Sequence, residues 1–177
     1  HVLPRLAGAD IEYTFTDIGP LFIAKARESF GSYGFMRFEV LDLEREPSQQ
    51  GFAGRQYDVV IASNVIHATA DLRQTLWRVR GLMAPGALLA MIEVTAPQRW
   101  FDLTVGLTTG WWSFSDRDLR PDYPTLSRER WLALLPNCGF EECVALPARE
   151  ERHGCLALQS ALLGRATVAT DREPGVW

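Results

Sequence analysis

His67 and Glu93 are the two residues whose types and spacing point most directly to chemistry. They lie 26 residues apart at the ends of two apolar runs, YDVVIASNVIH and ALLAMIEV, each typical of a buried parallel strand. Parallel strands joined by a crossover helix end at one sheet edge, where open α/β sheets bind ligands. A carboxylate beside an imidazole orients the ring and stabilises the imidazolium, so the pair predicts a base that removes a proton. A lone histidine in such a turn often bonds only a backbone carbonyl, but a carboxylate that closes an apolar strand needs a partner.

Three more polar residues lie at predicted strand ends. Asp17 closes the run IEYTFTDI, where a carboxylate either accepts bonds from the hydroxyls of a ribose or caps the following helix. Asp42 lies near the end of MRFEVLDLE and either meets an adenine amino group or faces solvent. Asn64 shares the turn SNVIHATAD with His67. Two acids on adjacent strands favour a nucleoside pocket only modestly.

A long stretch rich in aromatic, glycine and proline residues, APQRWFDLTVGLTTGWWSFSDRDLRPDYP, covers residues 96–124 and is called here the aromatic segment. Its length and composition predict a lid or substrate loop. Its rings either line an acyl-binding cleft or pack against one another. The part SDRDLRPDY predicts a solvated, internally paired loop, with Arg117 or Arg120 as an alternative contact for a phosphate-bearing carrier arm. The rings considered are Trp111, Trp112, Phe114 and Tyr123.

The elements that position these residues alternate between strand and helix, which predicts an α/β fold with a mostly parallel sheet. The predicted helices are PLFIAKARESFG, ADLRQTLWRVRGLMAPG and TLSRERWLALLPNCGF. The sequence PGA at Pro85 to Ala87 is expected to end the second helix, and Ser127 to cap the third. The runs FEECVALP and CLALQSALLGR predict an antiparallel pair, and REPSQQGFAGRQ a loop with one short helical turn.

The 177-residue chain, with 47% apolar residues, predicts one domain over residues 1–166 and a linker over residues 167–177. A net charge of −4 gives no reason to expect nucleic acid or an anionic membrane as partner. Neither a membrane-spanning run nor a signal sequence is expected, which favours a cytoplasmic protein. Histidine and cysteine spacing suggests no metal site, and the thiols Cys138, Cys143 and Cys155 are expected to be buried and reduced.

Taken together, the segments quoted above resemble the carbon-methyltransferase domains of modular type I polyketide synthases over nearly the whole chain. The resemblance implies a class I methyltransferase fold, which is Rossmann-like and binds S-adenosylmethionine. It implies methyl transfer to the carbon between the two carbonyls of a β-ketoacyl chain on an acyl carrier protein. Asp17 then falls on the ribose-binding acid, Asp42 on the adenine-side acid and Asn64 near the cofactor. His67 and Glu93 fall on the base pair.

The chain departs from this family pattern at its start, where the first strand, the first helix and a turn of the form ExGxGTGG would precede HVLP. Without that turn the cofactor pocket is expected to lack one wall, because a side chain cannot replace glycine backbone in contact with a ligand. The sequence therefore predicts an incomplete sheet and a non-catalytic pseudo-methyltransferase remnant, with vestigial cofactor residues and no bound cofactor. Its partners would be neighbouring reductase or dehydratase domains. The alternative is a fragment of a working carbon methyltransferase, which would also meet an acyl carrier protein.

Overall fold

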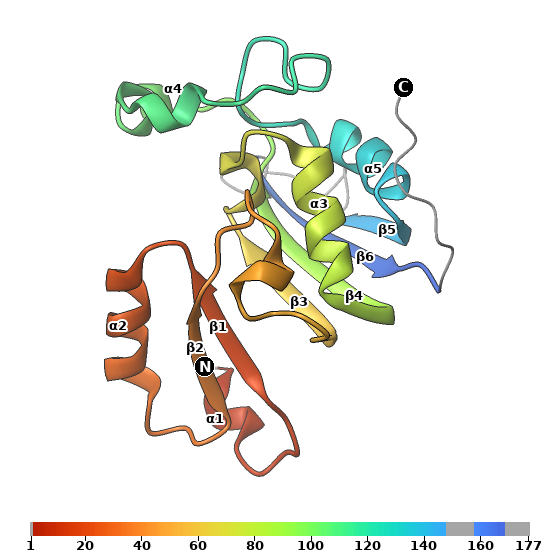
Figure 1. Ribbon diagram of the computed structural model, residues 1–177. Coiled ribbons are helices and arrows are strands. Elements are labelled where there is room, and N and C mark those ends of the chain that lie inside the picture. The colour runs from red at the N-terminus through yellow and green to blue at the C-terminus, as the bar shows by residue number, and fades with distance from the viewer. Residues whose placement is uncertain (1, 148–157, 169–177) are drawn as a thin grey trace. The chain divides into compact units, whose positions relative to one another are not determined.

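The computed structural model describes residues 2–147 and 158–168 (Figure 1). The chain forms two units, His1–Ala53 and Gly54–Trp177. The linker predicted for residues 167–177 lies outside the described residues, apart from Thr167 and Val168.

The first unit contains a two-stranded parallel sheet, in which Tyr13 pairs with Met36 and Asp17 with Val40. The connecting helix begins at a proline, whose fixed φ suits a first helical turn. This helix contacts both strands and buries Ile23 and Ala26. The elements of this unit are α1 (Leu3–Leu6), β1 (Tyr13–Asp17), α2 (Pro20–Phe30), β2 (Met36–Val40) and the 3-10 helix η1 (Pro47–Gln50). The short turn η1 confirms the helical turn predicted for the polar loop.

The second unit is built on a four-stranded sheet with the order β3-β4-β6-β5. Strands β3 and β4 are parallel, and β6 runs antiparallel to both β4 and β5. Within the described part of this sheet only β6 is reversed, so the α/β class with a mostly parallel strand direction is confirmed. The strands are β3 (Tyr57–Ser63), β4 (Met83–Val94), β5 (Phe140–Leu146) and β6 (Gln159–Ala166). The predicted antiparallel pair is β5 with β6, and Cys155 lies outside the described residues.

The crossover between β3 and β4 is α3 (Leu72–Gly81), which is drawn in front of β4 in Figure 1. Asp71 caps it by accepting a bond from the Gln74 N–H at 3.0 Å. Its apolar face is fully buried at Leu72 and Leu76, and in the adjoining strand Leu89 is buried as well. This packing forms the core beneath the turn that carries His67.

The prediction that Pro85 to Ala87 end the second helix is wrong. The helix α3 ends at Gly81, and β4 begins at Met83, which pairs with Tyr57. The next pair joins Val59 to Leu88, so the proline and glycine form an irregularity inside the strand. Such irregularities accept a proline, which has no N–H for the ladder, and a glycine with positive φ, which is +77° at Gly86.

The third predicted helix is α5 (Arg128–Asn137), and its predicted cap is confirmed. The Ser127 hydroxyl accepts a bond from the Arg130 N–H at 3.3 Å. The helix buries Trp131, Leu134 and Leu135, and it contacts β5. Among the described residues, no helix is both long and apolar enough to cross a bilayer.

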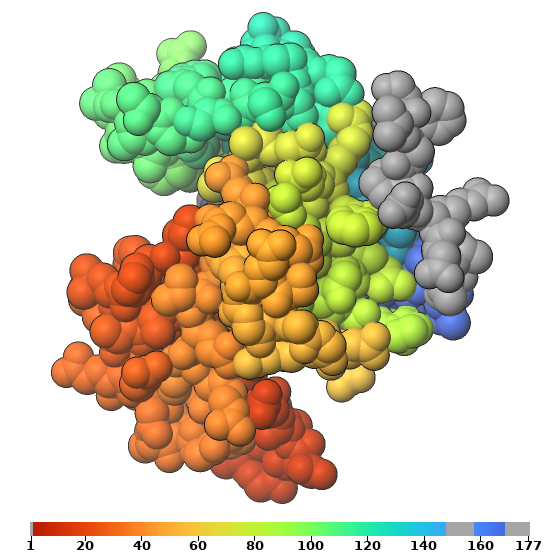
Figure 2. Space-filling model, viewed as in Figure 1, coloured from red at the N-terminus to blue at the C-terminus, as the bar shows by residue number. Residues whose placement is uncertain are grey.

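The aromatic segment contains three short helical turns joined by irregular backbone. Its green and teal atoms gather together at the top of Figure 2. The turns are α4 (Arg99–Asp102), η3 (Val105–Leu107) and η4 (Thr109–Trp112). The segment is therefore a largely irregular connection between β4 and α5, and several of its side chains are buried. Its role as a lid or substrate loop stays a prediction.

Candidate active site

The predicted contact between His67 and Glu93 is confirmed. The His67 Nδ1 lies 2.5 Å from the Glu93 Oε2, and the other oxygen, Oε1, accepts a bond from the Ile66 N–H at 3.0 Å. Glu93 is fully buried and His67 is 6% exposed. A carboxylate at Nδ1 favours the tautomer with the proton on that nitrogen, which leaves Nε2 with its lone pair. The pair can therefore act as an oriented base through Nε2.

His67 lies in the 3-10 turn η2 (Ile66–Ala68), which follows β3. Two buried hydroxyls stabilise this turn: Thr69 donates to the Ile66 carbonyl at 2.8 Å, and Thr75 donates to Thr69 at 2.8 Å. Buried polar groups of this kind need partners, and each hydroxyl here has one. The turn is thus tied to the start of α3 by side chains that the sequence analysis did not single out.

Asn64 precedes this turn and adopts a left-handed backbone conformation with φ of 51°. Asparagine tolerates this region better than most residues, so it suits the sharp exit from β3. Its N–H donates to the Ile92 carbonyl at 2.7 Å, and its side chain is exposed. The structure thus places Asn64 at the same sheet edge as the His67 pair.

Part of the aromatic set gathers beside the base. The rings of Trp111 and His67 meet edge to face with centroids 5.7 Å apart, and Trp111 stacks on Phe101 at 5.5 Å. Tyr123 meets Trp111 edge-on at 6.1 Å. Trp112 contacts Tyr123 instead, at 6.0 Å. The rings therefore pack against one another, and one indole lies against the imidazole. The alternative role of lining an acyl-binding cleft stays a prediction.

Tyr123 is tied into this cluster by its hydroxyl, which donates to the Asp102 Oδ1 at 2.8 Å. Burial, followed by the hydrogen bond to Asp102, raises the pKa of Tyr123 to about 12. The phenol is therefore neutral at physiological pH and serves as a donor.

The prediction of a solvated SDRDLRPDY loop is wrong for two of its charges. Arg120 is 1% exposed and Asp116 is 5% exposed, and the Arg120 Nε donates to the Asp116 Oδ1 at 2.6 Å. Phe114 is also buried, with the guanidinium of Arg120 5.0 Å from its ring centroid. Arg117 and Asp118 are exposed, as predicted. Arg120 is consequently not available to a carrier phosphate, because its donors are already engaged inside the protein.

In the first unit, Asp17 and Asp42 lie at the same edge of the parallel sheet. Asp17 accepts a bond from the Gly19 N–H at 2.7 Å. Gly19 is the N-cap residue of α2, and no side chain caps this helix. Asp42 accepts a bond from the Glu44 N–H at 2.8 Å. The structure thus brings each set of predicted residues together within its own unit.

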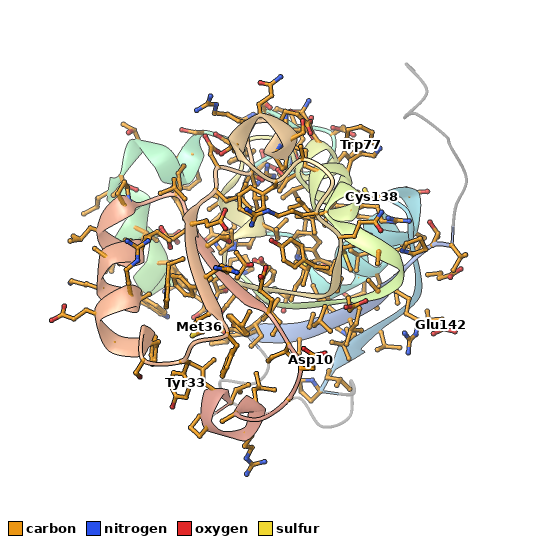
Figure 3. The ribbon with its side chains drawn as sticks, turned by 60° about the horizontal axis from the view of Figure 1, so that its bottom comes forward. Asp10, Tyr33, Met36, Trp77, Cys138 and Glu142 are labelled. Carbon is orange, nitrogen blue, oxygen red and sulfur yellow. The ribbon has the colours of Figure 1, made fainter. Side chains whose placement is uncertain are left out.

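The cysteines and possible metal ligands offer no further chemistry in the described residues. No cluster of histidine, cysteine and acidic side chains there could hold a metal ion. Cys138, labelled in Figure 3 just after α5, is buried, and burial raises its pKa to about 11. Cys143 is only half-buried, so the expectation of burial fits Cys138 better than Cys143.

The fold is that of a class I methyltransferase, and the His67–Glu93 pair lies at the strand ends of its sheet. A family model described as "Methyltransferase domain" matches residues 1–89, half of the 177 residues, and the chain belongs to this family. The structure is similar to that of the CurJ carbon methyltransferase, with a TM-score of 0.89 and 48% identity. It is also similar to the DszA carbon methyltransferase, with a TM-score of 0.86 and 32% identity. These matches cover 94% and 96% of this chain and 44% of each solved chain.

Similar sequences occur in fungal enzymes. The chain is 39% identical over 140 residues to the highly reducing polyketide synthase g433 of Fusarium sp, covering 79% of the chain and 6% of that synthase. It is 43% identical over 129 residues to the methyltransferase calH of Penicillium decumbens, covering 73% of the chain and 35% of that enzyme. The solved CalH structure, at 35% identity and a TM-score of 0.75, is a complex with SAH and matches 88% of this chain and 43% of its own. The chain is thus related to the methyltransferase domains of polyketide synthases and spans only a small part of the synthases themselves.

Proposed function

We propose that this chain is the base-bearing part of an S-adenosylmethionine-dependent carbon methyltransferase that acts on β-ketoacyl chains in a polyketide synthase. The observation that carries the proposal is the buried contact of His67 with Glu93, in which the carboxylate holds Nδ1 and leaves Nε2 as the basic atom. A non-catalytic structural domain, which the sequence first suggested, would need the Glu93 carboxylate only for stability and would have no chemical use for a basic Nε2.

The chemistry suits a carbon nucleophile. The hydrogen between two carbonyls is acidic, because the resulting charge spreads over both oxygens, so a neutral imidazole is a strong enough base to remove it. Glu93 stabilises the imidazolium that forms at His67 and keeps its ring from turning. S-adenosylmethionine, when bound, supplies an electrophilic methyl group for the carbon that has lost its proton.

The first unit has residues suited to the nucleoside part of this cofactor. A carboxylate accepts hydroxyl and amino hydrogens, and both Asp17 and Asp42 lie at the carboxyl edge of their sheet. A Cβ at Gly19 would lie 3.2 Å from the Asp17 Oδ1 and 3.0 Å from a ring carbon of Phe22, so glycine keeps space beside the carboxylate. Within this unit, we assign Asp17 to the ribose hydroxyls and Asp42 to the adenine amino group.

The relatives also suggest partners for the proposed enzyme. Those relatives that are polyketide synthases carry the similar region inside a far longer chain. An acyl carrier protein would present the β-ketoacyl substrate, and neighbouring synthase domains such as a reductase or dehydratase would contact the methyltransferase.

Proton removal can be tested without methyl transfer. The full polypeptide that carries this sequence is incubated in deuterated buffer with the N-acetylcysteamine thioester of 3-oxobutanoate, and exchange at the central carbon is followed by mass spectrometry. The wild type should exceed the uncatalysed rate, and His67→Ala should lower the catalysed rate by about 100-fold or more, as expected for loss of a general base. Asp118→Asn, which alters an exposed carboxylate of the same unit, is the matched control and should leave the catalysed exchange rate unchanged.

Methyl transfer and cofactor binding form a second, separate measurement. Isothermal titration with S-adenosylmethionine should show micromolar binding that Asp17→Asn weakens, and mass spectrometry should show a methylated thioester. Exchange and binding at background levels in the wild type would instead favour the structural role.

A further inference from the structure

The turn that carries His67 is held by a buried arginine as well as by Glu93. Arg120 comes from the aromatic segment, 53 residues further along the chain, and its Nη1 donates to the His67 carbonyl at 2.8 Å. We infer that Arg120, fixed by Asp116, is a positioning residue that sets the direction of the His67 ring.

The hydrogen bonds of Arg120 match its full donor capacity. A guanidinium has five N–H groups, and this one makes five bonds. The Nε donates to Asp116, and Nη1 bonds the carbonyls of His67 and Pro124 at 2.8 and 3.2 Å. The Nη2 donates to the carbonyls of Thr69 and Ala70 at 2.8 and 3.0 Å. Three of these acceptors belong to the four residues 67–70, so one rigid planar group fixes the whole turn.

Asp116 extends this attachment to the next element. Its Oδ1 holds the Arg120 Nε, and its Oδ2 accepts a bond from the Leu72 N–H at 3.0 Å. That N–H is the first of α3, which has no partner inside its own helix. Asp116 and Arg120 therefore join the end of the turn that carries His67 to the start of α3.

His67 is consequently fixed at three points. Glu93 holds its ring at Nδ1 and holds the preceding N–H at Ile66, while Arg120 holds its carbonyl. With the backbone fixed on both sides, the ring keeps one direction, and Nε2 keeps one position. A displacement of about 1 Å at such an atom can slow a reaction about 100-fold.

Stability alone is a weak reason for this arrangement. A buried ion pair gains little over apolar residues of the same volume, because both charges lose their hydration. The pair instead provides specific geometry, with every donor of Arg120 directed at a named acceptor. The same segment also places the Trp111 ring against the His67 imidazole.

Nitrogen NMR of this chain, labelled at histidine, tests the inference because it reports the tautomer of the His67 ring. The resonances of His67 are assigned with the His67→Gln variant. The wild type should show a single tautomer with the proton on Nδ1. Arg120→Met should give a mixture of tautomers, and Arg120→Lys, which restores part of the bonding, should lie between. Arg117→Lys is the matched control, because Arg117 lies over the same Phe114 ring at 4.1 Å but is exposed.

Asp116→Asn provides a second variant that keeps the arginine, should the Arg120 variants fail to fold. It should shift the His67 tautomer in the same direction but less. A wild-type His67 spectrum in folded Arg120→Met, or in Asp116→Asn where the arginine variants do not fold, would overturn the inference.

Activity adds a further reading, which rests on the proposed function. In the deuterium-exchange assay of the full polypeptide, Arg120→Lys should lower kcat about 10-fold, leave KM for the thioester unchanged and alter the pH profile. A shifted tautomer without any exchange in the wild type would leave the positioning role intact and contradict only the proposed function. A lower kcat in Arg120→Lys without a tautomer shift at His67 would overturn the positioning role.

Discussion

The indole of Trp111 meets the imidazole of His67 edge to face, with ring centroids 5.7 Å apart and planes inclined at 75°. This contact joins two stretches of the chain that the sequence presents separately, the strand-end turn and the aromatic segment. It means that changes in the aromatic segment act on the surroundings of the base.

The Trp111→Phe substitution should therefore change the magnetic surroundings of the His67 ring. The carbon-bound ring hydrogens of His67 should change their proton NMR shifts, because the ring current of an indole differs from that of a phenyl group. Trp111→Ala should lower the free energy of unfolding by about 1–3 kcal/mol in urea titrations, since the stacking on Phe101 and the edge-on contact with Tyr123 are lost. Trp112→Phe, which alters a ring that packs on Tyr123, is the control and should leave the His67 resonances in place. Unchanged His67 shifts in Trp111→Phe would contradict the contact.

Removing the Glu93 carboxylate should be costly to folding. Glu93→Ala leaves the His67 Nδ1–H and the Ile66 N–H buried without an acceptor, which predicts a loss of about 3 kcal/mol in the free energy of unfolding. Glu93→Gln retains one acceptor oxygen and should lose less, about 1–2 kcal/mol.

Urea titration measures both losses, and Glu142→Gln serves as the matched control. Glu142 is exposed on the outer strand β5 and pairs with Arg165, so its change should stay within about 0.5 kcal/mol (Figure 3). A loss in Glu93→Ala no larger than that of the control would show that the carboxylate is not essential to the turn.

The pKa of Tyr123 predicts a specific alkaline dependence. Its folded value of about 12 lies above the ordinary 10.0, because burial and then the bond to Asp102 favour the neutral phenol. Its contribution to stability is therefore complete below pH 10 and is lost as the pH rises toward 12. Spectrophotometric titration should show a tyrosinate component near pH 12 that Tyr123→Phe removes. Asp102→Asn should move this component down but keep it above 10, since burial is the larger cause.

Cys138 should react slowly with thiol reagents. Burial raises its pKa from 9.0 to about 11, and the thiolate is the reactive form. In a variant with Cys143→Ser and Cys155→Ser, an aromatic disulfide reagent at pH 8 should react about 100-fold more slowly than with a small free thiol. The reaction should accelerate in urea as the protein unfolds. A native rate equal to that of the small thiol would show that Cys138 is accessible.

The local elements and the residues at their ends can be predicted from short stretches of the chain. Alternating and continuous apolar runs produce β1 to β4. Pro20 begins α2, and Ser127 caps α5. The carboxylate of Glu93, in an apolar strand, already requires a polar partner. These features depend on neighbours in the chain, through backbone conformation and side-chain periodicity, so they can be deduced from composition and spacing.

The burial of Arg120 and the strand pairing of Pro85 could not be predicted in this way. Arg120 looked like a surface charge, because its main acceptors lie more than 50 residues away at His67 and Thr69. Pro85 looked like a helix end, yet pairing with β3 places it in an irregular strand. Whether a charge is buried, and which strand a segment joins, depends on contacts between distant parts of the chain. Only the folded protein brings those acceptors and strands together.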